Sequence, residues 1–187
     1  MKKLKQKVDR DLCKHAYNDT IEAVSRLAAY ATSRSLKILG HGEYYTVAEN
    51  LCRKDLLILG ISARRFAEIS QTTSSLKSRN VRISDQVSKE AGEKKSDSAW
   101  NIIGNIIHGN EITIFKELGK LEYAADRIDI FTSVTMTEEF DAAISIKSDK
   151  FERKYFILTD LLGAINSYIE EVSDSIDGVY LGSAYEI

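Results

Sequence analysis

The sequence predicts a mainly helical single domain of the α+β class, with a small antiparallel β-ribbon inserted before the last helix. Its 187 residues suit one domain that can bury a core without disulfides or metals. None of them is proline, which breaks helix interiors and is common in turns. Apolar residues recur at helical spacing in three segments before residue 109, and short segments beyond it alternate with a period of two.

Two long helices are expected in the first part of the chain. Apolar residues recur every three to five positions over residues 9–38, and Gly40 is expected to end this helix because glycine tolerates a left-handed backbone. A second helix is expected over residues 46–70. Its middle, residues 55–63, is apolar on nearly every side, which is typical of a central helix that packs on several neighbours.

Residues 71–98 differ in character from the helices before them. They include seven serines and ten charged residues, with only scattered apolar ones. This composition predicts an exposed, mobile loop with at most a weakly formed turn. A loop of this length within one domain is typically functional or disordered.

A third helix is expected from about Asp97 to Gly109. Ser96 or Asp97 can cap its first amides, and a glycine suits its C-terminal end. At 100° per residue, one arc of this helix is entirely apolar, which predicts that it packs on the core. The apolar arc consists of Trp100, Ile102, Ile103, Ile106 and Ile107.

The segments after this helix suggest short strands. Ile112 and Ile114 alternate with polar neighbours, and apolar residues alternate again in 129–134 and 142–147. The last two segments are expected to pair as an antiparallel ribbon. A further short strand is expected over residues 154–157.

The last helix is expected to begin at Thr159 or Asp160 and to end near residue 175. Its apolar positions, which should form its buried face, are Leu161, Leu162, Ile165, Tyr168, Ile169 and Val172. The tail, residues 178–187, is expected to be ordered only where it packs. The whole chain, residues 1–187, is thus predicted to form one domain with one long loop and a short tail.

Composition and charge limit the function. The 26 lysines and arginines are balanced by 28 aspartates and glutamates, which gives a net charge of −2. A protein that mainly coats nucleic acid is strongly basic, so any nucleic-acid role here must rest on a local patch. No membrane segment is expected, because the longest apolar run, residues 56–63, is too short to span a bilayer. Cys13 and Cys52 are expected to be buried thiols, and these features together predict a cytoplasmic protein.

The polar side of the third helix carries the sharpest candidate site. Asn101, Asn105 and His108 stand at i, i+4 and i+7, so their side chains form a single stripe. Two amides and an imidazole that titrates near neutral pH can hold a phosphate or a carbonyl, with His108 as acid or base. Gly104 would allow a ligand or another backbone to approach closely. The alternative is an ordinary amphipathic surface helix without a site.

Arg64 and Arg65 are the second candidates. The simpler interpretation pairs them with Glu68 on the same helix. The alternative places one guanidinium beside the stripe, where it would bind phosphate bidentately. No metal or cofactor is expected, because His15 and His41 lack ligand spacing and the sequence has no phosphate-loop, dinucleotide-binding or serine-esterase motif.

Two segments carry a family resemblance. Residues 99–109, AWNIIGNIIHG, resemble the HEPN superfamily, helical domains common in bacterial toxin–antitoxin and antiviral defence systems. Residues 55–66, DLLILGISARRF, are similar to the central helix of HEPN-like proteins of unknown function. The resemblance covers roughly residues 45–175. It implies a HEPN-like helical bundle and a homodimer joined along these helices.

The resemblance also bears on catalysis. Many members of the superfamily are metal-independent ribonucleases that use an arginine, an adjacent polar residue and a histidine after four to six intervening residues. Here the histidine would be His108, but positions 101–103 hold Asn-Ile-Ile where the arginine should stand. Ribonuclease activity is therefore implied only if Arg64 or Arg65 supplies the cation from the neighbouring helix.

Together these features predict a protein of a bacterial defence or toxin–antitoxin type. It would bind RNA or a partner protein at a groove lined by Asn101, Asn105 and His108. As an enzyme it would be a metal-independent ribonuclease, with His108 as general acid or base and Arg64 or Arg65 on the phosphate. The alternative is a non-catalytic dimeric protein-interaction module with no nucleic-acid role. A third hypothesis is a small-molecule binder that uses a cleft between the helices and the ribbon.

Overall fold

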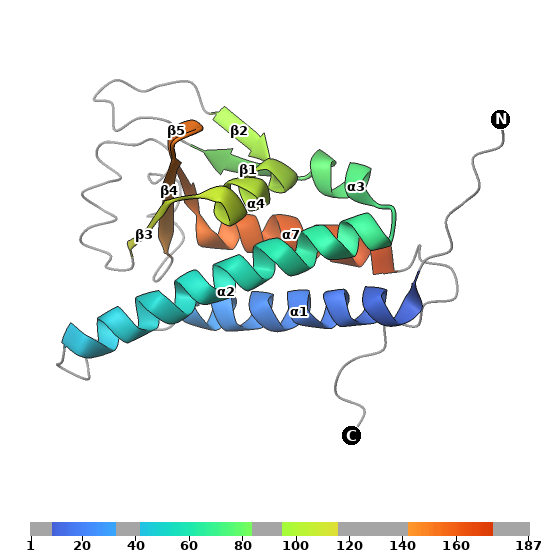
Figure 1. Cartoon of the computed structure of the whole chain (residues 1–187), viewed down its shortest axis with the longest axis horizontal. Coiled ribbons are helices and arrows are strands. Elements are labelled where there is room, and N and C mark those ends of the chain that lie inside the picture. Colours follow the sequence, from blue (N-terminus) through green and yellow to red (C-terminus); the bar gives the residue numbers. More distant parts are fainter. Residues whose placement is uncertain (1–8, 33–41, 84–94, 116–141, 174–187) are drawn as a thin grey trace.

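The computed structural model describes residues 9–32, 42–83, 95–115 and 142–173 (Figure 1). The helices are α1 (Arg10–Thr32), α2 (Gly42–Ile69), α3 (Thr73–Ser78), α4 (Ala99–His108) and α7 (Leu158–Ser173). The strands are β1 (Asn80–Ile83), β2 (Lys95–Ser98), β3 (Glu111–Phe115), β4 (Ala143–Ser148) and β5 (Phe151–Ile157). The predicted class, mainly helical with small antiparallel sheets, is confirmed. The HEPN-like assignment, the single domain and the homodimer stay predictions.

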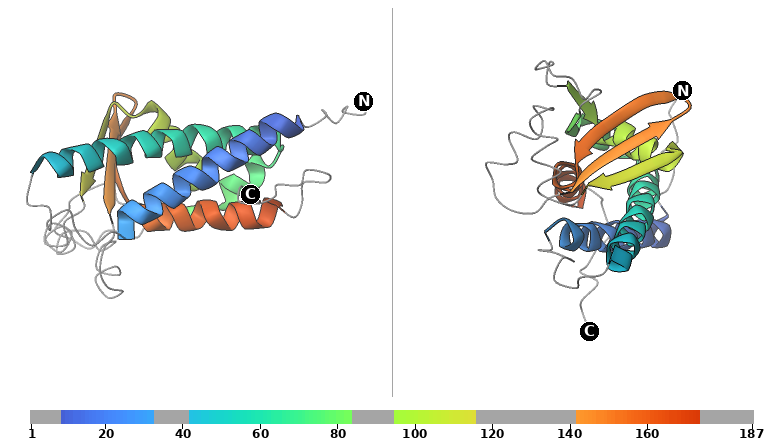
Figure 2. Two further views of the ribbon diagram at one scale, coloured as in Figure 1. Left: turned by 90° about the horizontal axis from the view of Figure 1, so that it is seen from below. Right: turned by 90° about the vertical axis from the view of Figure 1, so that its left-hand side faces the viewer.

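Helices α1 and α2 run antiparallel beside each other, as the three views agree (Figures 1 and 2). Small residues such as Ala16 and Ala23 form the buried face of α1 and let the two backbones approach closely. Cys13 and Cys52 are both buried in these helices, as predicted. Within the described ranges, no helix is both long enough and apolar enough to cross a membrane.

Three aromatic rings join α1, α2 and α7. Phe66 of α2 is fully buried and meets the rings of Tyr17 and Tyr168 edge-on, with centroids 5.6 and 5.9 Å away. The hydroxyl of Tyr168 lies 2.7 Å from that of Thr72, so the buried phenol keeps a hydrogen bond. The predicted buried face of the last helix is confirmed at all six positions.

The strands β3, β4 and β5 form an antiparallel sheet with β4 in the centre. Its register places Ile112 opposite Ile146, and Ile144 opposite Phe156. The short strand predicted over 154–157 is present as part of β5. The pairing predicted between residues 129–134 and 142–147 is wrong, because β3 and β5 already occupy both edges of β4. Residues 129–134 themselves lie outside the described part of the chain.

The loop predicted over residues 71–98 is wrong for most of the residues described there. Helix α3 and the β1–β2 hairpin occupy it, because three apolar side chains, Leu76, Val81 and Ile83, are buried in the core. Two basic residues also fix this segment to α7, since Arg82 forms a two-pronged ion pair with Asp160 at 2.7 and 2.8 Å and Arg79 pairs with Glu171.

Helix α4 packs on α2 with the face that the sequence predicts. Ile102, Ile103 and Ile106 are buried, while Trp100 and Ile107 are half-buried. The N-cap is Ser98 rather than Ser96 or Asp97, since its hydroxyl accepts a hydrogen bond from the Asn101 amide at 3.2 Å. These contacts leave the polar side of α4 facing outward.

Gly109 ends α4, as predicted. Its backbone is extended, with φ −72°, so no left-handed conformation requires glycine there. A Cβ at this position would instead lie 2.7 Å from Cγ2 of Ile146 and 2.9 Å from the carbonyl oxygen of Asn105. Glycine is needed because the end of α4 presses against the central strand of the sheet.

Candidate functional site

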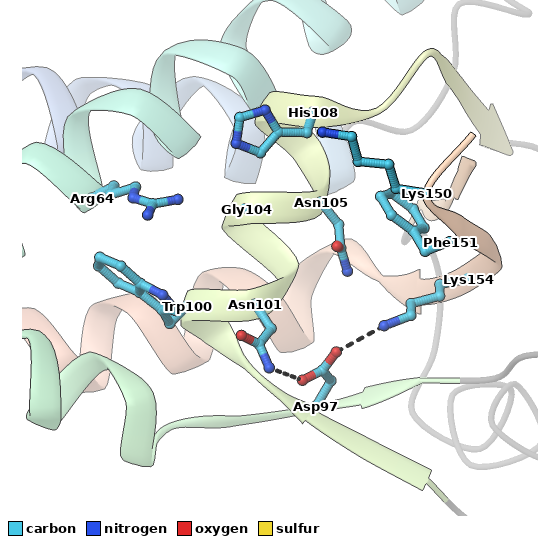
Figure 3. Close-up of a pocket in the computed structure, with 10 residues that line it drawn as sticks. All are labelled: Arg64, Asp97, Trp100, Asn101, Gly104, Asn105, His108, Lys150, Phe151 and Lys154. Atoms are coloured by element: carbon cyan, nitrogen blue, oxygen red, sulfur yellow. Dashed lines mark hydrogen bonds and ion pairs between the residues drawn. The ribbon is translucent and has the colours of Figure 1, made fainter. Parts of the chain in front are cut away.

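The polar stripe of α4, defined as Asn101, Asn105 and His108, forms the floor of a pocket of about 330 Å³ (Figure 3). Helix α2 provides one wall and the β4–β5 hairpin provides the other. The lining residues are Arg64, Asp97, Trp100, Asn101, Gly104, Asn105, His108, Lys150, Phe151 and Lys154. The pocket thus lies between the helices and the strands, where the small-molecule hypothesis expects a cleft.

Arg64 is held in a defined orientation on the α2 wall. Its Nε donates a hydrogen bond to Oε1 of Glu68 at 3.1 Å, and its guanidinium carbon lies 4.3 Å above the centre of the Trp100 ring. A Cβ on Gly104 would come within 3.8 Å of Nη1, so the fork of the guanidinium lies over the middle of α4. Arg64 therefore pairs with Glu68 and also lies beside the stripe, while phosphate binding there stays a prediction.

Arg65 does not line the pocket. Successive residues of a helix are 100° apart, and Arg65 is accordingly exposed on a different side of α2. Trp100, expected on the apolar arc, is half-buried and forms part of the pocket wall, with Lys77 Nζ 5.4 Å from its ring centre as a second cation. Of the two arginines predicted for the site, the fold brings only Arg64 to the stripe.

An aspartate that the sequence suggested only as a cap ties the floor of the pocket to its hairpin wall. Oδ1 of Asp97 accepts hydrogen bonds from Nδ2 of Asn101 at 2.7 Å and from the Ser98 amide at 2.8 Å, while Oδ2 accepts from Nζ of Lys154 at 3.0 Å. Burial by itself would raise the pKa of the Asp97 carboxyl, but the hydrogen bonds from Asn101 and Lys154 outweigh burial and hold the pKa below its ordinary value. The amide of Asn101 is therefore engaged in holding the hairpin to α4.

Replacing Asp97 by asparagine is expected to destabilise the protein by about 1 kcal/mol at pH 7, because the half-buried ammonium of Lys154 loses its counter-ion. The pKa of Asp97 is lower in the folded state than in the unfolded state, so its carboxylate contributes its full share to the free energy of unfolding above the unfolded pKa of about 3.9. This contribution is lost as the pH falls through the folded pKa. Urea unfolding of both proteins should therefore show a difference in stability at neutral pH that closes at acidic pH, once Asp97 is protonated in the folded state as well. A difference that persists at low pH would contradict this assignment.

Asn105 occupies the centre of the floor. Its Nδ2 is buried and has no hydrogen-bond partner within the described ranges. Such an unpaired buried donor costs about 1–3 kcal/mol. The side chain therefore has capacity for a ligand that supplies an acceptor.

His108 lies exposed at the C-terminal end of the stripe. The β4–β5 turn reaches the same end, because Nδ2 of Asn110 donates to Oδ1 of Asp149 at 2.7 Å. This bond brings Lys150, the next residue, to the pocket. The stripe thus ends with the imidazole of His108, at the end of the pocket where Lys150 also lies.

The pocket is basic although the chain as a whole is not. Three cations, Arg64, Lys150 and Lys154, line it against the single carboxylate of Asp97. The hairpin residues were not predicted as site residues, because they lie far from α4 in sequence and no spacing along the chain links them to it. In the part of the chain that the structure describes, no group of three His, Cys, Asp or Glu side chains could hold a metal ion. The chemistry available is that of anion and polar-group binding, with one imidazole at hand.

No family model matches this chain, and neither a curated protein nor a solved structure does.

Proposed function

We propose that this protein binds RNA at the pocket over α4, as a HEPN-like protein of a bacterial defence or toxin–antitoxin type. The observation that carries the proposal is the position of Arg64, whose oriented guanidinium lies over the polar stripe beside Trp100. An arginine fork matches the geometry of a phosphate better than a lysine does. The cation that the HEPN resemblance lacks within α4 is thus supplied by α2.

The remaining lining residues suit the other parts of a nucleotide. RNA is recognised largely through unpaired bases that stack on aromatic side chains and pair along their edges. Phe151 offers an aromatic surface at the hairpin, and the spare donor of Asn105 offers an edge contact. The local excess of positive charge is the patch that a weakly acidic protein needs for this role.

RNA cleavage is an activity separate from binding, and the same residues would suit it. In metal-independent cleavage the ribose 2′-oxygen forms a bond to the adjacent phosphorus while the bond to the 5′-oxygen breaks. His108 would take the proton of the 2′-hydroxyl, Arg64 would stabilise the charge on the phosphorane, and the leaving 5′-oxygen would take a proton from a water molecule. Cleavage that persists in EDTA and is lost in His108→Ala supports this role. Intact RNA in the bound complex limits the function to binding.

The non-catalytic interaction module remains the second candidate. It is favoured by the apolar side chains that α2 exposes, Val47, Leu51, Leu57 and Ile61. Absence of RNA binding by the wild-type protein would leave this candidate in place of the first.

Replacing Asn105 by leucine separates a ligand-binding role from a structural one. Because the buried Nδ2 has no partner in the free protein, we expect the variant to be more stable by about 1 kcal/mol. It should also bind RNA about 5- to 10-fold more weakly, since the pocket loses a hydrogen bond. The two measurements are urea unfolding and fluorescence anisotropy of a labelled RNA. A variant that is less stable and binds RNA as the wild type does would show that Asn105 serves the fold instead.

A further inference from the structure

The β4–β5 turn that carries Lys150 has a backbone held in a defined position beside the pocket. The Lys150 amide donates to Oγ of Ser148 at 3.0 Å, and the neighbouring Asp149 is bound to Asn110 at the end of α4. The backbone of the turn is thus tied at two points. The side chain of Lys150 is exposed, and its ammonium forms no ion pair with any residue that the structure describes.

The two lysines of the hairpin differ in available charge. Lys154 is neutralised by Asp97, so its ammonium is committed to the fold. Lys150 lies at the His108 end of the floor and has no such carboxylate partner among the residues that the structure describes. Arg64 stands on the opposite wall, beside Gly104 and Trp100 (Figure 3). The floor from Asn101 to His108 spans seven residue steps of helix, which is about 10 Å.

We propose that Lys150 and Arg64 contact successive phosphates of a single-stranded RNA that crosses α4, with one unpaired nucleotide seated between them. This inference rests on the proposed function and names its substrate class. A floor about 10 Å long and a pocket at the small end of the usual range leave room for one nucleotide turned out of its stack. An edge contact with Asn105 requires a base whose pairing edge is free, which a base paired within a duplex does not offer.

These two phosphate contacts, from Lys150 and Arg64, are called the clamp below. The salt dependence of binding tests the clamp, because each phosphate contact on a single strand adds about 0.7 to the slope of log K against log salt. Fluorescence anisotropy with a short labelled single-stranded RNA is measured for the wild type, Lys150→Gln, Arg64→Gln and the double variant. We expect each single change to lower the slope by about 0.7 and the double change by about 1.4. Lys150→Gln should weaken binding about 3- to 10-fold at low salt.

Lys147→Gln is the matched control. Lys147 is exposed on β4 of the same hairpin and does not line the pocket, so the same loss of charge should leave the slope within error of the wild type. The same RNA annealed to its complement should bind with an affinity at least about 10-fold lower than that of the single strand.

The possible results separate the clamp from RNA binding at the pocket. A wild-type protein that binds single-stranded RNA through Arg64, but whose slope is the same in Lys150→Gln, overturns the clamp and leaves RNA binding standing. Equal affinity for the duplex overturns the single-stranded class. A wild-type protein that binds no RNA overturns the proposed function itself, and the clamp with it.

Discussion

Replacing Gly109 by alanine is expected to lower the stability of the protein by about 3 kcal/mol. The added Cβ would stand 2.7 Å from Cγ2 of Ile146 and 2.9 Å from the backbone oxygen of Asn105. The side chain of Ile146 is fully buried in the central strand, and the carbonyl belongs to the last turn of α4, so neither can move without shifting its element. In a chain of this size the loss corresponds to a fall of about 10 °C in Tm, measured by circular dichroism.

Gly163→Ala is the matched control for this prediction. Gly163 lies within α7, and nothing stands within 4 Å of the position of its Cβ. The same substitution should therefore raise stability by about 0.5–1 kcal/mol, because alanine favours the helix interior. If Gly109→Ala proved as stable as the wild type, the close contact between α4 and β4, which joins the floor of the pocket to the sheet, would not exist as described.

Replacing Arg64 by alanine is expected to weaken RNA binding about 10- to 100-fold. The guanidinium is already oriented by Glu68 and by the Trp100 ring, so little entropy is lost when it binds a phosphate. The protein itself should lose no more than about 1.5 kcal/mol of stability, since the pair with Glu68 is largely exposed and the contact with Trp100 is modest. Anisotropy and urea unfolding measure the two effects.

Arg65→Ala removes the same charge from the neighbouring position of α2. Arg65 is exposed and does not line the pocket, so its loss should change RNA affinity less than about 3-fold. If both variants weakened binding equally, RNA would be held by the general charge of α2 and not by the pocket.

The sequence was sufficient for the elements whose pattern is local. The period of 3.6 identified α1, α2, α4 and α7, and it placed Asn101, Asn105 and His108 on one stripe. It failed over residues 71–98, because a polar average conceals the few apolar side chains that anchor α3 and β1. Three buried residues in a serine-rich segment give a weak signal, although they are sufficient to order it against α7.

The candidate site was predicted only along its floor. The choice between Arg64 and Arg65 depends on how α2 rotates against α4, and one sequence does not contain that angle. The hairpin wall depends on strand pairing between distant segments, so Lys150 and Lys154 carried no signal near α4. The sequence predicted Asp97 as a candidate capping residue, but its bond to Lys154 depends on the position of the β4–β5 hairpin, which the sequence pattern did not reveal.

The central claim, that RNA occupies the pocket over α4, is tested most directly by the fluorescence of Trp100. This is the single tryptophan of the chain and it lines the pocket, so its emission reports on that one place. We expect single-stranded RNA to change the emission saturably, at the same concentrations at which anisotropy shows binding, and we expect Arg64→Ala to need about 10- to 100-fold more RNA. RNA that binds by anisotropy without altering Trp100 emission, or that does not bind at all, would contradict the account.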